Sequence, residues 1–344
     1  MVPLLEIHAQ TSHLLRTHPS PLIAVFVGGT SGIGTHTVLA LASAHAKNST
    51  QPLLLFIVGR NKDAATRIIA ECKELCPHGD FRFVQARDLS LLKDVDRVCE
   101  EIRRILDERE KVKGEKAWID LLVMTQGVLT LSRNATKEGL DATYSLMYYS
   151  RMRFITQLLP LLVCSPLPSR VISILNPKLH SKLIPDDLSL RKHSILRYAS
   201  SHSDACLSRG GDDGYVGEGG VSRWLKWTWK FGIGPVMKFW ETEGEVCGER
   251  ILWLASERWR PRGLGSDGDR EGKGDGEDSL WGIELVEAVD GTPGGGMYNV
   301  GSVGERYPTP KMYKKYKEDG VAEVVWKHTM DAFKVIEEGG VFQG

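Results

Sequence analysis

The sequence predicts an α/β fold built on a doubly wound parallel sheet with flanking helices. Two observations carry this prediction. Short apolar runs alternate with longer amphipathic segments in the first half of the chain, and a glycine-rich turn follows directly after the first apolar run. Buried parallel strands are apolar runs of about four to eight residues, whereas helices need about 12 or more. The alternation therefore indicates strand–helix–strand units.

The predicted elements follow one another without interruption up to Pro185. Each predicted strand is apolar, and each predicted helix has apolar residues at helical spacing. The predicted strands are Leu22–Val27, Leu53–Val58, Phe81–Val84, Ile119–Met124 and Arg170–Ile174, and the predicted helices are Ile33–Ala46, Lys62–Leu75, Leu89–Glu110 and Lys137–Val163.

Beyond Pro185 the regular alternation ends. Residues 208–220 are rich in glycine and residues 262–279 in Gly, Asp and Glu, which is the composition of flexible loops. Helical spacing returns in two further segments, Glu243–Glu257 and Val321–Glu338. We expect an N-terminal extension over residues 1–20 and a single domain over residues 21–344.

The composition limits the classes of partner. The 344 residues include 44 Lys and Arg and 44 Asp and Glu, so the formal net charge is zero. Nucleic acids and anionic membranes attract proteins with a positive excess, so we expect neither as a partner. No uncharged apolar run approaches the length of about 18 residues that spans a bilayer, and residues 1–20 lack a signal peptide. We therefore expect a soluble, cytoplasmic protein, and the six cysteines show no spacing that completes a metal site.

The turn after the first predicted strand reads Phe26-Val-Gly-Gly-Thr-Ser-Gly-Ile-Gly34. A dinucleotide site needs a sharp turn, close approach of a pyrophosphate to the backbone, and a helix N-terminus aimed at its charge. The alternative is a glycine-rich join between strand and helix that binds nothing. Because the turn lies between a strand and a helix of a doubly wound pattern, we expect a dinucleotide site. Its predicted cradle consists of Gly28, Thr30, Ser31, Gly32, Ile33 and Gly34.

The end of the second predicted strand indicates which dinucleotide binds. An acidic residue there would accept the ribose hydroxyls of NAD, but this chain has Arg60, followed by Asn61 and Lys62. A guanidinium suits a 2′-phosphate, so we expect NADP(H) in preference to NAD(H), with Arg60 and Asn61 in the cofactor site. The alternative for Arg60 is a solvated residue that starts the next helix.

After the third predicted strand, Asp88 stands where a carboxylate can accept the adenine amino group. Its alternative role is in the N-cap region of the helix that follows. The two roles do not exclude each other.

These features together resemble the short-chain dehydrogenase/reductase family, which has a Rossmann fold. The resemblance rests on Gly28-x-x-x-Gly32-x-Gly34, Arg60, Asp88 and the turn Met124-Thr-Gln-Gly127. It implies that Gln126 and Gly127 line the ribose side of the cofactor. The segment Arg170-Val-Ile-Ser-Ile-Leu-Asn176 resembles an atypical fungal subgroup that occurs among enzymes of secondary metabolism.

The resemblance also implies a catalytic set of Ser, Tyr, a Lys four residues after the Tyr, and an Asn on the preceding helix. Here Asn176 stands at the position of the Ser, with Ser173 three residues earlier, and Met147 stands at the position of the Asn. Two overlapping segments compete for the Tyr-x-x-x-Lys position: Tyr198-Ala-Ser-Ser-His202 has the tyrosine but a histidine in place of the lysine, and His202-Ser-Asp-Ala-Cys206 fits the helix slightly better but has neither residue. We expect Tyr198, His202 and Ser173 to be the catalytic residues, the alternative for Tyr198 being a packing residue on a helix.

The resemblance predicts a sixth strand after this segment, but the glycine-rich loop follows Cys206 almost at once. We therefore expect a missing or distorted sixth strand, which would expose the edge of the fifth. The expected function is an NADP(H)-dependent ketone reductase or alcohol dehydrogenase, acting as a homo-oligomer on a hydrophobic small molecule such as a secondary-metabolite or polyketide intermediate. The alternative is a catalytically impaired relative that binds a nucleotide or a partner protein.

Overall fold

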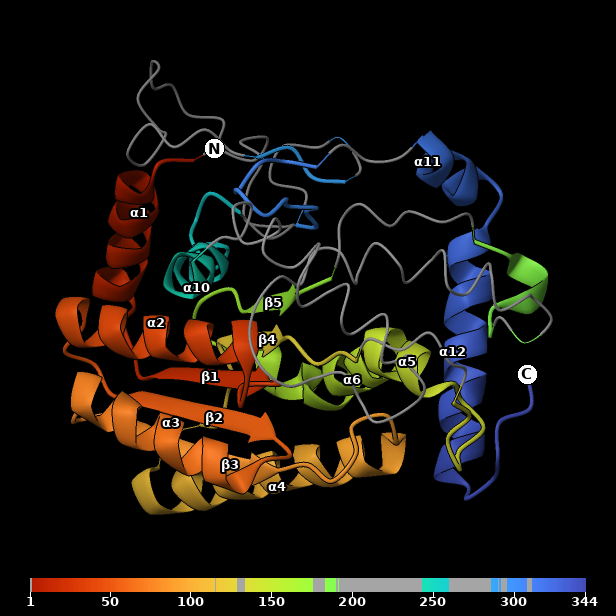
Figure 1. The fold of residues 1–344 in the computed structure, drawn as a ribbon, viewed down its shortest axis with the longest axis horizontal. Coiled ribbons are helices and arrows are strands. Elements are labelled where there is room, and N and C mark those ends of the chain that lie inside the picture. The colour runs from red at the N-terminus through yellow and green to blue at the C-terminus, as the bar shows by residue number, and fades with distance from the viewer. Residues whose placement is uncertain are drawn as a thin grey trace, which may run out of the picture.

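The computed structural model describes residues 2–114, 116–128, 134–175, 183–189, 191, 243–259, 286–289, 291, 296–307 and 311–344. Within these residues, parallel strands form one five-stranded sheet of order β3-β2-β1-β4-β5 (Figure 1). The strands are β1 (Leu22–Val27), β2 (Leu53–Gly59), β3 (Asp80–Gln85), β4 (Leu121–Met124) and β5 (Arg170–Ser173). The doubly wound α/β fold predicted from the sequence is confirmed.

Helices cover both faces of this sheet. Figure 1 shows α2 and α10 over one face and α4 on the opposite side. The helices are α1 (Leu4–Thr17), α2 (Gly32–Asn48), α3 (Lys62–Leu75), α4 (Leu92–Lys113), α5 (Ala142–Tyr144), α6 (Ser150–Leu162), α10 (Gly244–Trp253), α11 (Lys311–Glu318) and α12 (Val321–Glu337), with a π-helical turn η1 (Ser145–Tyr149) and a 3-10 turn η2 (Pro185–Asp187).

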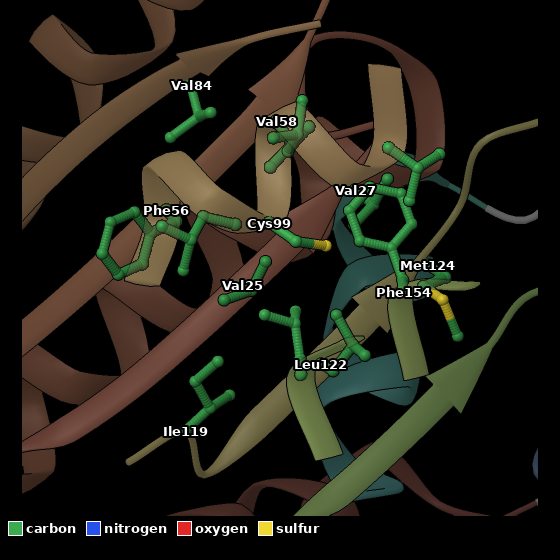
Figure 2. Close-up of a cluster of buried hydrophobic side chains, with 14 of the residues drawn as sticks. Val25, Val27, Phe56, Val58, Val84, Cys99, Ile119, Leu122, Met124 and Phe154 are labelled. Carbon is green, nitrogen blue, oxygen red and sulfur yellow. The ribbon is translucent and has the colours of Figure 1, made fainter. Parts of the chain in front are cut away.

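The apolar side chains of the strands divide between two core clusters. Figure 2 shows the cluster under α4 and α6, where Val25 and Met124 meet Cys99 and Phe154. The residues that alternate with them along the strands, such as Phe26, pack under α2 and α10 instead. Because β1, β2 and β4 are buried on both faces, their sequences are unbroken apolar runs.

A tight helix crossing closes one face of the sheet. A Cβ atom added to Gly248 of α10 would lie 2.4 Å from the backbone oxygen of His36 in α2, so only glycine lets the two helices approach this closely. Helix α1, within the expected N-terminal extension, packs beside them through the buried side chain of Leu15. The N-terminal segment therefore adds to the same apolar core as α2 and α10.

The C-terminal helix α12 is joined to the opposite face by a buried cation. Arg153 of α6 donates to Asp96 of α4 at 2.6 Å and also to Glu337 of α12. Its guanidinium carbon lies 5.0 Å from the centre of the Phe333 ring. These contacts place α12 beside α4 and α6 near the carboxyl ends of the strands (Figure 1).

One predicted helix begins later in the structure, and several other predicted features lie outside the described residues. The helix expected to begin at Lys137 begins at Ala142, because the Asp141 side chain accepts the N–H groups of Thr143 and Tyr144 and caps it there. The expected loops at 208–220 and 262–279, and the place of the expected sixth strand, lie outside the described residues. None of the described helices is long and apolar enough to cross a membrane.

Candidate active site

Two glycines of the turn after β1, Gly28 and Gly34, have no room for a side chain. Gly28 has a φ of +86° and donates its N–H to the Val58 carbonyl at 2.9 Å. A Cβ atom on Gly28 would lie 2.6 Å from Thr125 Oγ1, and one on Gly34 would lie 2.3 Å from the Gly28 oxygen. The turn is therefore as narrow as a backbone cradle for a pyrophosphate requires.

The N-terminus of α2 opens toward this turn without a side-chain cap. Ser31 is the N-cap residue, yet its side chain makes no capping hydrogen bond, and Gly32 has a φ of +52°. The first turn of α2 carries no acidic residue. Unpaired N–H groups and the positive end of the helix dipole make such a terminus a binding place for phosphate.

The other two residues of the predicted cradle have different surroundings. Thr30 lies against β2, since a Cβ atom on Gly59 would come within 2.4 Å of its Oγ1. Ile33 packs against the apolar cluster under α2. Thr30 therefore borders the turn, whereas Ile33 anchors the start of α2.

Arg60 and Asn61 follow β2 at the edge of the sheet where the glycine turn lies. The Arg60 side chain is exposed, and its backbone carbonyl accepts from Gln85 Nε2 at 3.4 Å. Asn61 is the N-cap of α3, with its Oδ1 accepting from the Ala64 N–H at 3.0 Å. The Asn61 side chain thus serves the helix, whereas the exposed Arg60 suits a phosphate.

Asp88 lies in the turn between β3 and α4. Its Oδ1 accepts both the N–H and the hydroxyl of Ser90, at 2.9 and 2.7 Å. The N-terminus of α4 is capped instead by Glu138, whose carboxylate accepts the N–H groups of Leu92 and Lys93. Asp88 is exposed, so its carboxylate remains accessible from solvent.

The end of β4 borders the glycine turn. Thr125 Oγ1 lies 3.1 Å from the Val27 carbonyl and 3.2 Å from that of Gly28, so it fixes the turn to β4. Gln126 is 6% exposed, and neither polar atom of its amide has a partner among the described residues. Gly127 is exposed, and among the described residues a Cβ atom on it would meet Met147 Sδ alone, at 3.8 Å. A buried amide without a partner is costly, so Gln126 is suited to receive a ligand.

Ser173 ends β5, and its hydroxyl is held by a buried arginine. Ser173 Oγ accepts from Arg151 Nη1 at 2.6 Å. The same guanidinium donates to the Met124 carbonyl at 3.0 Å and to that of Gln126 at 2.6 Å. Sequence reasoning did not single out Arg151 or Thr125, because the partners of both lie far from them along the chain.

The comparisons with known proteins give a family. No protein-family model matches the chain. The short-chain dehydrogenase/reductase SAT2 of Stachybotrys chartarum is 32% identical to it over 337 residues, which cover 90% of this chain and 91% of that protein. The oxidoreductase andH of Emericella variicolor is 30% identical over 359 residues, covering 97% and 98%. The chain belongs to the short-chain dehydrogenase/reductase family. By this membership it is classed as an oxidoreductase enzyme.

Solved structures of reductases are also similar to this short-chain dehydrogenase/reductase. The NADP active-site complex of RhlG from Pseudomonas aeruginosa matches with a TM-score of 0.44 and 20% identity, over 70% of this chain and 91% of that one. YwfH, an NADPH-dependent reductase of bacilysin biosynthesis, matches with a TM-score of 0.38 and 19% identity, over 55% and 63%. Family membership rests on the curated relatives.

The described part of the short-chain dehydrogenase/reductase contains the predicted cofactor residues but only part of the predicted catalytic set. The ends of β1, β2 and β4 meet at the glycine turn, and the Ala86 N–H donates to Gly59 at 2.9 Å, which joins the segment before Asp88 to the end of β2. Ser173 is described, whereas Tyr198 and His202 lie outside the described residues. No group of three or more metal-binding side chains occurs in the described ranges.

Proposed function

We propose that this chain is an NADP(H)-dependent reductase that interconverts a ketone and an alcohol on a hydrophobic small molecule. One observation carries the proposal: the glycine turn, in which Gly28 and Gly34 have no room for a Cβ atom, lies beside an uncapped helix N-terminus and the Gln126 amide, which has no partner among the described residues. Each of the three features suits a dinucleotide, and together they border one place at the carboxyl edge of the sheet.

The roles in cofactor binding follow from the positions of the residues. Backbone groups of the glycine turn and the N-terminus of α2 bind the pyrophosphate, with the Thr30 and Ser31 hydroxyls beside them. Arg60 pairs with the 2′-phosphate, which is the basis for preferring NADP(H). Asp88 accepts the adenine amino group, and Gln126 and Gly127 line the ribose side.

When bound, the cofactor exchanges a hydride with the carbonyl carbon of the substrate. In the reductive direction the electron pair of the carbonyl π bond moves to oxygen, and that oxygen then takes one proton. We assign the proton to the Tyr198 hydroxyl, with His202 as its neighbour in proton transfer. The Ser173 hydroxyl orients the substrate oxygen by a hydrogen bond.

The proposed setting follows the resemblance of the sequence and the source of the relatives. SAT2 and andH come from fungi, and a secondary-metabolite or polyketide intermediate is the substrate class that we propose. We propose a cytoplasmic homo-oligomer, which sedimentation of the purified chain would test.

The cofactor assignment is tested by titrating the protein with NADPH and with NADH while following nicotinamide fluorescence. In Arg60→Glu, NADPH affinity should fall by about tenfold more than NADH affinity, because a charge-assisted hydrogen bond is lost only for NADPH. Arg67→Glu is the matched control, since Arg67 is exposed on helix α3, which begins just after Arg60. An equal loss for both cofactors in Arg60→Glu would contradict the role in binding the 2′-phosphate.

The catalytic assignment is tested with NADPH and a panel of aromatic and aliphatic ketones, following absorbance of the reduced nicotinamide. Turnover should occur and should decrease strongly in Tyr198→Phe and in His202→Ala. Cofactor binding without turnover of any ketone would favour the catalytically impaired alternative. If neither NADPH nor NADH binds, both the active reductase and a nucleotide-binding relative are contradicted.

A further inference from the structure

Arg151 is a buried cation at the carboxyl edge of the sheet. Arg151 is only 4% exposed, although arginine side chains are seldom buried without an anionic partner. Within the described ranges the guanidinium makes four hydrogen bonds, one from Nε to the Leu146 carbonyl and three to Met124, Gln126 and Ser173. All four acceptors are neutral oxygens.

No carboxylate among the described residues forms an ion pair with Arg151. Burial alone lowers the pKa of its guanidinium, to about 10, so the group is still charged at neutral pH. Arg153, two residues along the same helix, is also buried but pairs with Asp96 and Glu337. One helix therefore carries a compensated and an uncompensated buried cation, and only the uncompensated one lies at the ends of β4 and β5.

The strand order places Arg151 on one side of the glycine turn. Arg60 and Asp88 follow β2 and β3, on one side of β1, whereas Gln126 and Ser173 are at β4 and β5, on the other. A dinucleotide whose phosphates bind at the β1 turn and at Arg60 extends its nicotinamide half toward β4 and β5. Arg151 donates hydrogen bonds to Gln126 and Ser173, which lie on this β4–β5 side of the glycine turn.

We propose that Arg151 makes the site select the reduced cofactor and thereby directs the enzyme toward reduction of its substrate. The inference rests on the proposed function. Oxidised nicotinamide carries a positive charge on its ring and reduced nicotinamide carries none. Because Arg151 is buried, water screens its charge little, so this cation without a counter-ion repels the charged oxidised ring and exerts no such repulsion on the neutral reduced one.

The same guanidinium orients Ser173. Because Ser173 Oγ accepts the Arg151 hydrogen bond, the hydroxyl hydrogen of Ser173 is directed away from the guanidinium and is available to an acceptor. A donor polarised by a fixed positive charge stabilises the negative charge that develops on a carbonyl oxygen when it receives a hydride. Arg151 is thus a positioning residue that acts through Ser173 and through its field.

The experiment measures the dissociation constants of NADP⁺ and NADPH, by calorimetry, for the wild-type chain and three variants. Arg151→Gln removes the charge, Arg151→Lys keeps it, and Arg153→Gln removes the compensated cation as a matched control. We expect the wild type to bind NADPH more tightly than NADP⁺. We expect the ratio of the two constants to decrease by about threefold to tenfold in Arg151→Gln and to remain near the wild-type value in the other two.

Two results would overturn the inference while leaving the proposed function intact. One is a wild-type chain that binds NADP⁺ as tightly as NADPH, which decides the matter even if a variant fails to fold. The other is an Arg151→Gln variant that melts cooperatively and keeps the wild-type ratio. Binding of neither cofactor by the wild type would instead contradict the proposed function.

Discussion

A buried charged residue at each end of the sheet, Asp120 at the amino end and Arg151 at the carboxyl end, has a different set of partners. At the amino end, Asp120 is 7% exposed and its carboxylate accepts from the Ile23 N–H at 2.7 Å, Trp118 Nε1 at 3.0 Å and Ser165 Oγ at 2.6 Å. His18 Nε2 lies 3.6 Å from the same carboxylate. At the carboxyl end, Arg151 has only neutral acceptors among the described residues.

The charge of Asp120 stabilises the fold, whereas we assign the charge of Arg151 to the cofactor site. Asp120 connects α1, β1 and the segment before β5 through donors that leave little of its charge unneutralised. Arg151 also joins the ends of β4 and β5, but through neutral acceptors, and we propose that its charge acts on the bound cofactor. Changes at the amino end should therefore alter stability, and changes at the carboxyl end should mainly alter binding.

The largest effect is expected for Asp120→Ala. Removing this carboxylate leaves the buried Ile23 N–H and Trp118 N–H without acceptors and His18 without its partner. The free energy of unfolding should decrease by about 3 to 5 kcal/mol, measured by urea denaturation.

Two controls accompany this change. Ser165→Ala, which removes only one of the hydrogen bonds to Asp120, should lower the free energy of unfolding by about 1 kcal/mol. NADPH affinity of the folded Asp120→Ala protein should match the wild type. If Asp120→Ala is as stable as the wild type, or if it folds but no longer binds NADPH, the two ends of the sheet do not differ in the way described.

An intermediate effect is expected for Gly34→Ala at the carboxyl end. Its methyl group would lie 2.3 Å from the Gly28 oxygen, so the turn must widen. Overpacking of this kind costs about 1 to 3 kcal/mol in stability, and NADPH affinity should decrease by about tenfold or more.

The matched control for Gly34→Ala is Gly79→Ala at the amino end of the sheet, where the added methyl group would lie 2.6 Å from the Phe81 ring. It should lower stability by a similar amount and leave the NADPH affinity of the folded protein unchanged. Fluorescence titration and thermal melting measure the two properties. If Gly34→Ala binds NADPH as tightly as the wild type, the glycine turn is not part of the cofactor site.

The smallest effect is expected for His18→Gln. Burial lowers the pKa of His18, but the hydrogen bond and charge of Asp120 outweigh burial and raise it above 6.5, with the Ser20 carbonyl contributing. A raised pKa means that the folded state binds the proton more tightly than the unfolded state. The stabilisation by His18 is therefore complete below pH 6.5 and is lost as the pH rises through the folded-state pKa.

The measurement compares the unfolding free energies of wild type and His18→Gln between pH 6 and pH 8. The difference between the two proteins should shrink as the pH rises. His45 is buried nearby, and its pKa is lowered by burial and by the charge of His18, so its contribution to pH dependence has the opposite sign. A difference that grows with pH would show that His18 and Asp120 do not form the pair described.

The sequence was a reliable guide where the signal is local. The bounds of β1 were predicted to the residue, because the apolar run is limited by Pro21 and by Gly28. Strand β4 was expected from Ile119 but begins at Leu121, since the Ile119 N–H bonds to Leu161 in α6 and leaves the ladder. Local composition indicates that a strand exists more surely than it indicates where the strand starts.

The buried charges could not be predicted in the same way. Arg151 lies 22 residues from Ser173 and 27 from Met124, and Asp120 lies 97 residues from Ile23, so only the fold brings these partners together. In the sequence each is an ordinary charged residue beside apolar ones. The glycine turn was identifiable because a tight turn demands particular residues at consecutive positions, whereas a buried ion demands only that its partners arrive from elsewhere.

The crossing of α10 over α2 at Gly248 has a consequence for biosynthesis. Helix α2 and the sheet face beneath it leave the ribosome early, but α10, which covers them, ends only at Trp253. During the intervening synthesis the apolar cluster that includes Leu41 and Ala42 of α2 lacks its members from α10, such as Ile251 and Leu252. Contacts so distant along the chain form slowly, and exposed apolar surface promotes aggregation in the meantime. We expect chaperones that bind nascent chains to increase the yield of folded protein, whereas the stability of the protein once folded should depend little on them.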